Sequence, residues 1–253
     1  MLNVMIWSVG IFLETILLVR GFQEKLYRKF PIFYAYFLFV TLVDLVRIGV
    51  YRWVPIHFFQ VYWVTQFLSL AIGSGIIFEI YRVALRPFRG AARMTRYALL
   101  IVFGAIFAKA LTIASGGVFT WLAAASIVLE RNLRIVQALA ILTLVLLFFW
   151  YAIPFGRNLK GILFGYSLFI GLSIVQFLLW RYSWEQIKPF WSYAQPLCYL
   201  LVIGIWVRTL WSAAPPPEVN PDVQVESDYK FLVATTRGQF RKTLARLGWA
   251  ARA

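Results

Sequence analysis

Residues 58–78 read FFQVYWVTQFLSLAIGSGIIF and contain no charged side chain. A helix of about 20 apolar residues is long enough to cross the hydrocarbon core of a bilayer. Glu79-Ile80-Tyr81-Arg82 follows directly, so charged residues return where such a helix would leave the membrane. The stretch therefore predicts a transmembrane helix over residues 58–80.

The composition of the whole chain agrees with a membrane protein. Of its 253 residues, 62% are hydrophobic and 14% are charged, whereas about 25% of the residues of a soluble domain are charged. A soluble fold could not cover so apolar an interior with polar surface, but an outward-facing apolar side chain is stable in lipid. We therefore expect an all-α integral membrane protein.

Six further apolar stretches resemble the first one. Together they predict a bundle of seven transmembrane helices over residues 2–19, 31–50, 58–80, 97–114, 130–151, 162–180 and 190–211. The region before the fifth helix is ambiguous, because residues 110–129 are also uncharged and long enough to span. Since Ser115-Gly116-Gly117 favours a turn, residues 118–129 either form an outer re-entrant or interfacial piece or extend the fifth helix.

The positions of the basic residues predict the orientation of the chain. The net charge is +15, and the Lys and Arg side chains cluster between apolar stretches and near the C-terminus, which indicates membrane topology rather than nucleic-acid binding. With the N-terminus outside and the C-terminus in the cytoplasm, the inner side receives Arg20, Lys25, Arg28, Lys29, Arg82, Arg86, Arg89, Arg93, Arg96, Arg157, Lys160, Arg208 and the basic tail. We expect this arrangement in a bacterial inner (plasma) membrane.

The chain divides into a seven-helix domain (1–212), a Pro-rich acidic linker (213–228) and a basic tail (229–253). In the tail, Phe240, Leu244, Leu247 and Ala251 share one helical face. This pattern predicts an amphipathic helix over residues 229–250 that lies on the anionic lipids of the inner leaflet. Docking of the tail onto a membrane or cytoplasmic protein partner is the alternative.

No reaction is indicated by the sequence. The single cysteine, Cys198, and the single histidine, His57, exclude a disulfide within the chain and a multi-histidine metal site. There is no nucleophile elbow or phosphate-binding loop, and the seventh stretch has no lysine for a retinal Schiff base. We expect neither an enzyme nor a metal or other cofactor.

Ionisable side chains inside the apolar stretches are the candidates for function, since each costs about 2.5–3.5 kcal/mol to insert. The candidates in the predicted outer half are Asp44, Arg47, His57, Lys109, Glu130, Arg131, Arg134 and Gln137, with Gln60, Gln66, Gln176 and Gln195 beside them. We expect these faces to converge on a cavity open to the outside, in which an excess of basic groups favours a small anionic ligand. The alternative is structural: Asp44 pairs with Arg47, and Arg131 and Arg134 reach lipid headgroups.

Three further expectations concern single positions. Lys109 has no acidic residue within a helical turn, so we expect it within salt-bridge reach of Asp44 or Glu130, because an unpaired buried charge is unstable. Glu14, Asp44 and Glu79 are candidates for proton coupling if the protein is a transporter. The glycines of the sequence Gly161-Ile162-Leu163-Phe164-Gly165 predict close approach of a neighbouring helix.

The leading hypothesis for function is a sensor or receptor-like protein that binds a small polar or anionic ligand and reports through its tail. The alternatives are a small-solute transporter, in which proton coupling is an option, and a structural or assembly subunit of a membrane complex. A sensor predicts a closed inner half and an ordered contact with the tail, and a transporter predicts a polar path through both halves. Helices one to three and five to seven are candidates for an internal repeat, although the sequence itself shows none.

Overall fold

The computed structural model describes residues 2–113, 117–150, 156–182 and 184–215, together with Phe231 and Thr235. These residues form helices and the turns between them, and none of them lies in a strand. The long helices are α1 (Leu2–Gln23), α2 (Pro31–Trp53), α3 (Phe58–Ala84), α4 (Arg89–Leu111), α5 (Val118–Trp150), α6 (Arg157–Tyr182) and α7 (Trp184–Thr209). Short 3-10 turns, η1 (Leu26–Arg28) and η2 (Pro55–His57), join α1 to α2 and α2 to α3.

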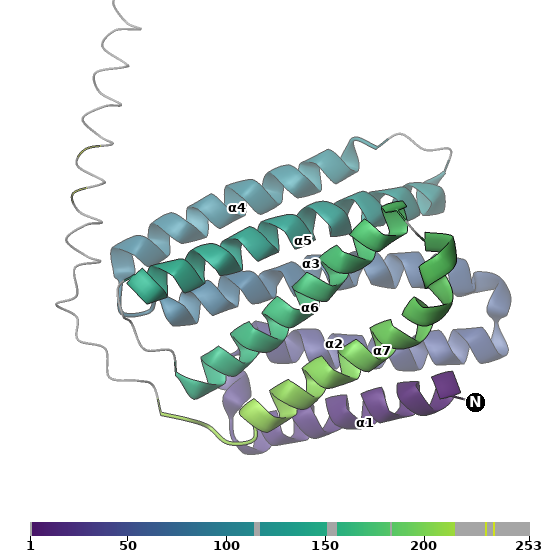
Figure 1. The fold of residues 1–253 in the computed structure, drawn as a ribbon, viewed down its shortest axis with the longest axis horizontal. Helices are drawn as coiled ribbons and strands as arrows, with labels where there is room; N and C mark the ends of the chain where they lie inside the picture. The colour runs from purple at the N-terminus through teal and green to yellow at the C-terminus, as the bar shows by residue number, and fades with distance from the viewer. Residues whose placement is uncertain are drawn as a thin grey trace, which may run out of the picture.

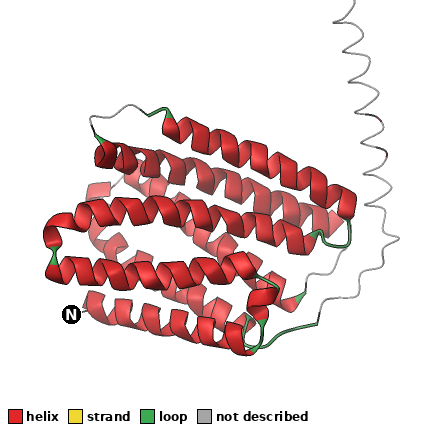
Figure 2. Cartoon of the chain, turned by 180° about the vertical axis from the view of Figure 1, so that it is seen from behind, coloured by secondary structure: helices red, strands yellow, loops and turns green. Residues whose placement is uncertain are grey.

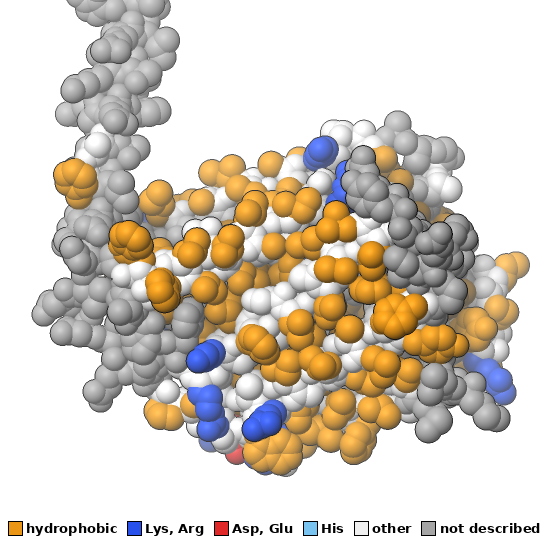
Figure 3. Space-filling model, viewed as in Figure 1, with side chains coloured by type: hydrophobic (Ala, Val, Ile, Leu, Met, Phe, Trp, Pro, Cys, Tyr) orange, Lys and Arg blue, Asp and Glu red, His pale blue; other side chains and the backbone are white. Residues whose placement is uncertain are grey.

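The helices present apolar surface to their surroundings. Among the described residues, five helical segments are long and apolar enough to cross a membrane: Pro31–Trp53, Pro55–Ala84, Gly90–Leu111, Val118–Trp150 and Arg157–Leu179. Only 17–33% of their most apolar windows is buried inside the protein, and Figure 3 shows apolar side chains spread over the face in view. Because such a surface is stable in lipid, the prediction of an all-α multispan membrane protein is confirmed.

Two helices, α4 and α5, differ most from their predicted bounds. α4 begins at Arg89, so Arg93 and Arg96 lie in its first two turns rather than in a loop. α5 runs without interruption from Val118 to Trp150, so residues 118–129 extend the fifth helix. Its 33 residues correspond to about 50 Å, which exceeds the roughly 30 Å of a hydrocarbon core.

Six of these helices form a ring. α1 packs against α2 and α7, α2 against α3, α3 against α5, α5 against α6, and α6 against α7. In the part of the chain that the structure describes, α4 packs only against α3 and α5, and it lies at the edge of the bundle in Figures 1 and 2. Consecutive helices run antiparallel, so α1–α3 and α5–α7 are two three-helix groups that run in the same directions.

Close packing of α6 on α7 depends on two glycines. A Cβ atom at Gly161 would overlap the side chain of Thr209, and one at Gly165 would overlap the ring of Trp206. The Trp206 indole N–H donates to the carbonyl oxygen of Ile162 at 3.3 Å. The predicted close approach of a helix to the Gly161–Gly165 element is therefore confirmed, and its partner is α7.

We expect Gly165→Ala to destabilise the protein by about 1–3 kcal/mol, because Trp206 is buried and has no room to move. Gly171→Ala on the same helix is the matched control, since a Cβ there meets no atom within 4 Å, and its effect should stay within about 1 kcal/mol. Unfolding in detergent, followed by denaturant titration, measures both. Equal effects of the two variants would refute the packing role of Gly165.

The end of the bundle at which α1 joins α2 and α7 ends, here called the closed end, has a packed interior. Phe33 and Phe37 meet Trp206 edge-on, with ring centroids 5.4 and 5.2 Å apart. Nearby, the Tyr81 hydroxyl donates to the carbonyl oxygen of Ala140. The rings of Phe33, Phe37 and Trp206 are buried, so these side chains fill the space between α2 and α7 at this end.

Candidate functional site

A cavity of about 570 Å³ lies between the six ring helices, in the half away from the closed end. Its volume lies in the range of small-molecule sites. Every ring helix contributes side chains to it, and α4 contributes none among the described residues. The polar and charged lining residues are Glu14, Tyr36, Asp44, Arg47, Tyr62, Gln66, Ser69, Glu130, Arg134, Gln137, Tyr166, Ser173, Gln176, Gln195, Cys198 and Tyr199.

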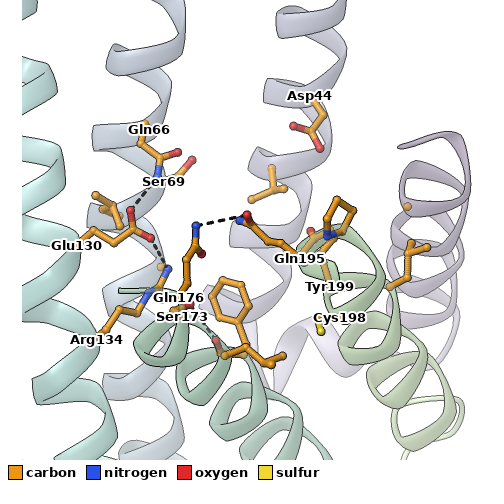
Figure 4. Close-up of a pocket in the computed structure, with 18 of the residues that line it drawn as sticks. Asp44, Gln66, Ser69, Glu130, Arg134, Ser173, Gln176, Gln195, Cys198 and Tyr199 are labelled. Atoms are coloured by element: carbon orange, nitrogen blue, oxygen red, sulfur yellow. Dashed lines mark hydrogen bonds and ion pairs between the residues drawn. The ribbon is translucent and has the colours of Figure 1, made fainter. Parts of the chain in front are cut away.

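One wall of the cavity is a charged network on α5. Arg134 donates to Glu130 at 3.3 Å and to Gln137 at 3.2 Å, because residues three and four apart share a helix face. Gln66 of α3 reaches the same carboxylate at 3.5 Å, and the guanidinium lies 4.6 Å from the centre of the Phe169 ring. Figure 4 shows this network facing into the cavity.

Arg47 on α2 turns toward α3 and not toward Asp44. Its Nε donates to the Thr65 hydroxyl at 2.9 Å, and its guanidinium lies 4.6 Å from the centre of the Tyr62 ring. The ion pairs among the described residues are Arg20–Glu24, Arg82–Glu79 and Arg134–Glu130. The Asp44–Arg47 pair of the structural alternative is therefore not formed, and the Asp44 carboxylate lies on the cavity wall without a hydrogen bond to any described residue.

Glu14 on α1 lies on the cavity wall, and the side chain itself is almost fully buried, with 1% of its surface exposed. The Tyr199 hydroxyl donates to it at 2.7 Å, and the Thr41 hydroxyl lies 2.8 Å from its other oxygen. The same Thr41 oxygen lies 2.9 Å from the carbonyl oxygen of Phe37. Because a hydroxyl has one hydrogen, the Thr41 hydroxyl shares it between Glu14 and the carbonyl oxygen of Phe37 in a three-centre hydrogen bond.

Glu79 is placed far from this cavity, at the closed end. Its carboxylate accepts the backbone N–H groups of Ile32 and Phe33 at 2.9 and 2.7 Å, and Arg82 lies 3.2 Å away. The first N–H groups of a helix have no partner within the helix, so Glu79 caps α2 from another helix. This structural role argues against Glu79 as a residue for proton coupling.

Three predicted site residues are not brought to the cavity. Lys109 is exposed on α4, outside the ring, and pairs with no acidic group among the described residues. His57 lies in η2, where its Nδ1 is 2.7 Å from Gln60 Oε1. Arg131 is exposed, because the residue after Glu130 is rotated by about 100° around the helix.

These placements change the expected charge of the site. Without Lys109 and Arg131, the described residues of the lining include two guanidinium groups and three carboxyl groups. Among these residues there is no excess of basic groups that would favour an anionic ligand. The roles of the lining residues in binding stay predictions, as does the role of Asp44 in proton coupling.

Cys198 allows this charge balance to be measured, because it is the single cysteine of the chain and lines the cavity. We expect a cationic thiosulfonate reagent to modify Cys198 at least as fast as an anionic one of equal size, and up to about tenfold faster. Each rate is normalised to that of a free thiol in solution, and Asp44→Asn should lower the ratio. If the anionic reagent modifies Cys198 faster than the cationic one, the predicted excess of basic groups in the cavity is correct.

Sequence reasoning missed the aromatic part of the site. Tyr36, Tyr166, Trp191 and Tyr199 line the cavity, and the Tyr166 hydroxyl donates to the carbonyl oxygen of Gly73 at 3.0 Å. The Trp191 indole N–H is buried without a hydrogen-bond partner among the described residues. Aromatic residues occur throughout this chain, so their sequence positions carry no signal that separates these four from the rest.

Sequence reasoning also missed how the segment after α7, residues 210–214, is held. Asn158 in the first turn of α6 is buried. Its amide donates to the carbonyl oxygens of Thr209 and Ser212 at 3.1 and 3.0 Å and accepts the Ala214 N–H at 2.7 Å. The start of the segment that leads to the tail is therefore fixed to α6.

α1 and the following turn hold the same segment from the other side. Arg20 donates to the carbonyl oxygen of Trp211 at 2.8 Å, and Glu24 accepts the Ala213 N–H at 3.2 Å. Lys29, between η1 and α2, is half-buried at this end, and burial first and the Arg86 guanidinium second lower the pKa of Lys29. The closed end therefore carries positive charge that is only partly neutralised by the described residues.

The cavity thus brings together carboxyl, guanidinium, amide and hydroxyl groups. No cluster of three or more His, Cys, Asp or Glu side chains suited to a metal ion occurs in the part of the chain that the structure describes. Comparisons of the chain with protein-family models, curated proteins and solved structures find no match.

Proposed function

We propose that the protein is a membrane sensor that binds a small polar molecule in the ring cavity. The observation that carries this proposal is the convergence of charged and polar side chains from six helices on one cavity of about 570 Å³. Charged groups are costly inside a membrane and mark functional sites there by default. With two guanidinium and three carboxyl groups on its wall, the cavity suits a neutral or zwitterionic ligand better than a simple anion.

Two features of the closed end support a sensor. The packed rings of Phe33, Phe37 and Trp206 leave the cavity without a continuation through this half. The 210–214 segment is held by α1 and α6, two helices that also line the cavity. A shift of these helices on ligand binding would therefore move the start of the chain that leads to the tail. The predicted linker (213–228) and amphipathic tail (229–253) lie almost entirely outside the described residues.

The native Cys198 tests the binding proposal directly. The purified protein is incubated with a panel of small polar solutes, and the rate of Cys198 modification is measured for each. A ligand should slow modification at least about tenfold by occupying the cavity, while a thiol on the outer surface, placed by Leu111→Cys in a Cys198→Ser background, keeps its rate. If no neutral, zwitterionic, cationic or anionic solute of the panel protects Cys198, the binding proposal fails.

We further propose that the chain spans the membrane seven times, with the cavity end outside and the closed end in the cytoplasm of a bacterial cell. The basic groups at the closed end support this orientation. Arg93→Cys in a Cys198→Ser background should resist an impermeant maleimide added to intact cells and react after lysis. Reaction in intact cells would reverse the orientation.

A proton-coupled transporter is the second candidate, favoured by the buried carboxyl group of Glu14 on the cavity wall and by the ring itself. Three-helix groups that run in the same directions around a central site are the arrangement of parallel-repeat transporters. Uptake of the protecting solute by proteoliposomes, driven by a proton gradient and lost in Glu14→Gln, would establish transport. If the protein binds the solute but does not transport it, the transporter is excluded and the sensor remains the proposed function.

A further inference from the structure

A second pocket, of about 550 Å³, lies at the closed end, where α6 begins and α7 ends. The described residues that line it are Arg157, Arg208, Thr209, Trp211 and Ser212, and none of these is acidic. Figure 3 shows several Lys and Arg side chains gathered at the lower left of the bundle, where α6 begins and α7 ends in Figure 1, with apolar side chains beside them. We propose that this pocket binds the phosphate headgroup of an anionic phospholipid.

The two guanidinium groups have hydrogen-bond donors to spare. Arg208 is exposed and makes no hydrogen bond or ion pair with another described residue. Arg157 uses one nitrogen, Nη2, for the Ser212 hydroxyl and carbonyl oxygens, and its Nε and Nη1 have no partner among the described residues. Guanidinium forks bind phosphate oxygens in pairs, so the pocket offers the donors that a phosphate requires.

The surroundings of the pocket select a lipid over a soluble phosphate. Phe164 lies seven residues after Arg157 on α6, and Leu201 lies seven residues before Arg208 on α7, so each shares a helix face with its arginine. Both apolar side chains are more than half exposed, at 61% and 56%, and two helical turns place them about 10 Å further into the membrane. The indole ring of Trp211, which is half exposed, has the interfacial position that tryptophan prefers.

The site therefore has charged groups where a lipid has its headgroup and apolar surface where a lipid has its acyl chains. Its charged groups lie at the boundary of the span Arg157–Leu179, and apolar surface continues from them along α6 and α7. A soluble phosphate would use the arginines and leave this surface unused. The site is separate from the ring cavity and from the predicted tail, so the proposal does not depend on the proposed function.

The test uses the full chain in nanodiscs of phosphatidylcholine, with and without phosphatidylglycerol. Phosphatidylglycerol should raise the thermal unfolding temperature of the wild type. In Arg208→Gln, and in the double variant Arg157→Gln/Arg208→Gln, the apparent affinity for phosphatidylglycerol should fall about tenfold, as expected for the loss of charge-assisted contacts. The shift is measured within each variant, so a lower starting stability does not affect it.

The matched control removes two exposed arginines of the same end but outside the pocket. Arg93→Gln/Arg96→Gln changes the net charge equally and should keep the wild-type response. Inorganic phosphate added to phosphatidylcholine nanodiscs should produce no shift. The proposal is overturned if Arg208→Gln responds like the wild type, if the control loses the response equally, or if inorganic phosphate reproduces it.

Discussion

Replacing Glu79 by alanine is expected to lower the free energy of unfolding by about 3 kcal/mol, since each buried N–H group left unpaired costs about 1–3 kcal/mol. The change removes the acceptor for the N–H groups of Ile32 and Phe33. α2 has no replacement, because its N-cap residue, Phe30, forms no side-chain cap. Denaturant unfolding in detergent measures the loss.

Two further variants separate capping from proton coupling. Glu79→Gln retains one acceptor oxygen, so it should lose roughly half as much stability, whereas a proton site would tolerate this neutral mimic fully. Arg82→Gln should stay within about 1 kcal/mol, because the Arg82 side chain is 59% exposed. An alanine variant as stable as the wild type would refute the capping role.

Arg134→Met is expected to destabilise the protein by about 3 kcal/mol, because it leaves the partly buried Glu130 carboxylate without its cation. The double variant Arg134→Met/Glu130→Gln should recover most of that stability. Protection of Cys198 by the bound solute should remain lost in both variants, since the charged wall is gone.

Lys109→Met is the control for this pair. Lys109 is exposed on α4 and does not line the cavity, so the variant should keep both the stability and the Cys198 protection of the wild type. If Lys109→Met loses the protection of Cys198, Lys109 contributes to the binding site, as the sequence predicted. If the bound solute again protects Cys198 in Arg134→Met/Glu130→Gln, the Glu130–Arg134 pair has a structural role and no role in binding.

The sequence predicted the convergence of polar groups but not its exact membership. Asp44, Arg47, Glu130, Arg134 and Gln137 could be placed because they occur within apolar stretches at spacings that share a helix face. Lys109 satisfies the same criteria. It differs only because α4 packs outside the ring, and which helix lies outside is decided by packing between helices distant in sequence.

Glu79 illustrates a signal that the sequence carries in two separate places. Pro31 marks the start of α2, and the preceding Phe30 has no side-chain acceptor for the free N–H groups of the first turn. A helix that begins without its own side-chain acceptor, and that has an acidic residue at the same depth on a neighbouring helix, is predicted to be capped by that acidic residue. The neighbour's identity still requires the fold, because Glu79 is separated from Ile32 by 47 residues.

The outlying position of α4 has a consequence for how such a chain could arise. A three-helix segment starts and ends on opposite sides of the membrane, so two copies of one gene joined directly would insert in opposite orientations. One additional helix between them gives both copies the same orientation and lets them close into a ring. α4 has this position in the chain and, among the described residues, touches the ring only at the α3–α5 junction. Its sequence is therefore free to diverge wherever it does not contact these two helices.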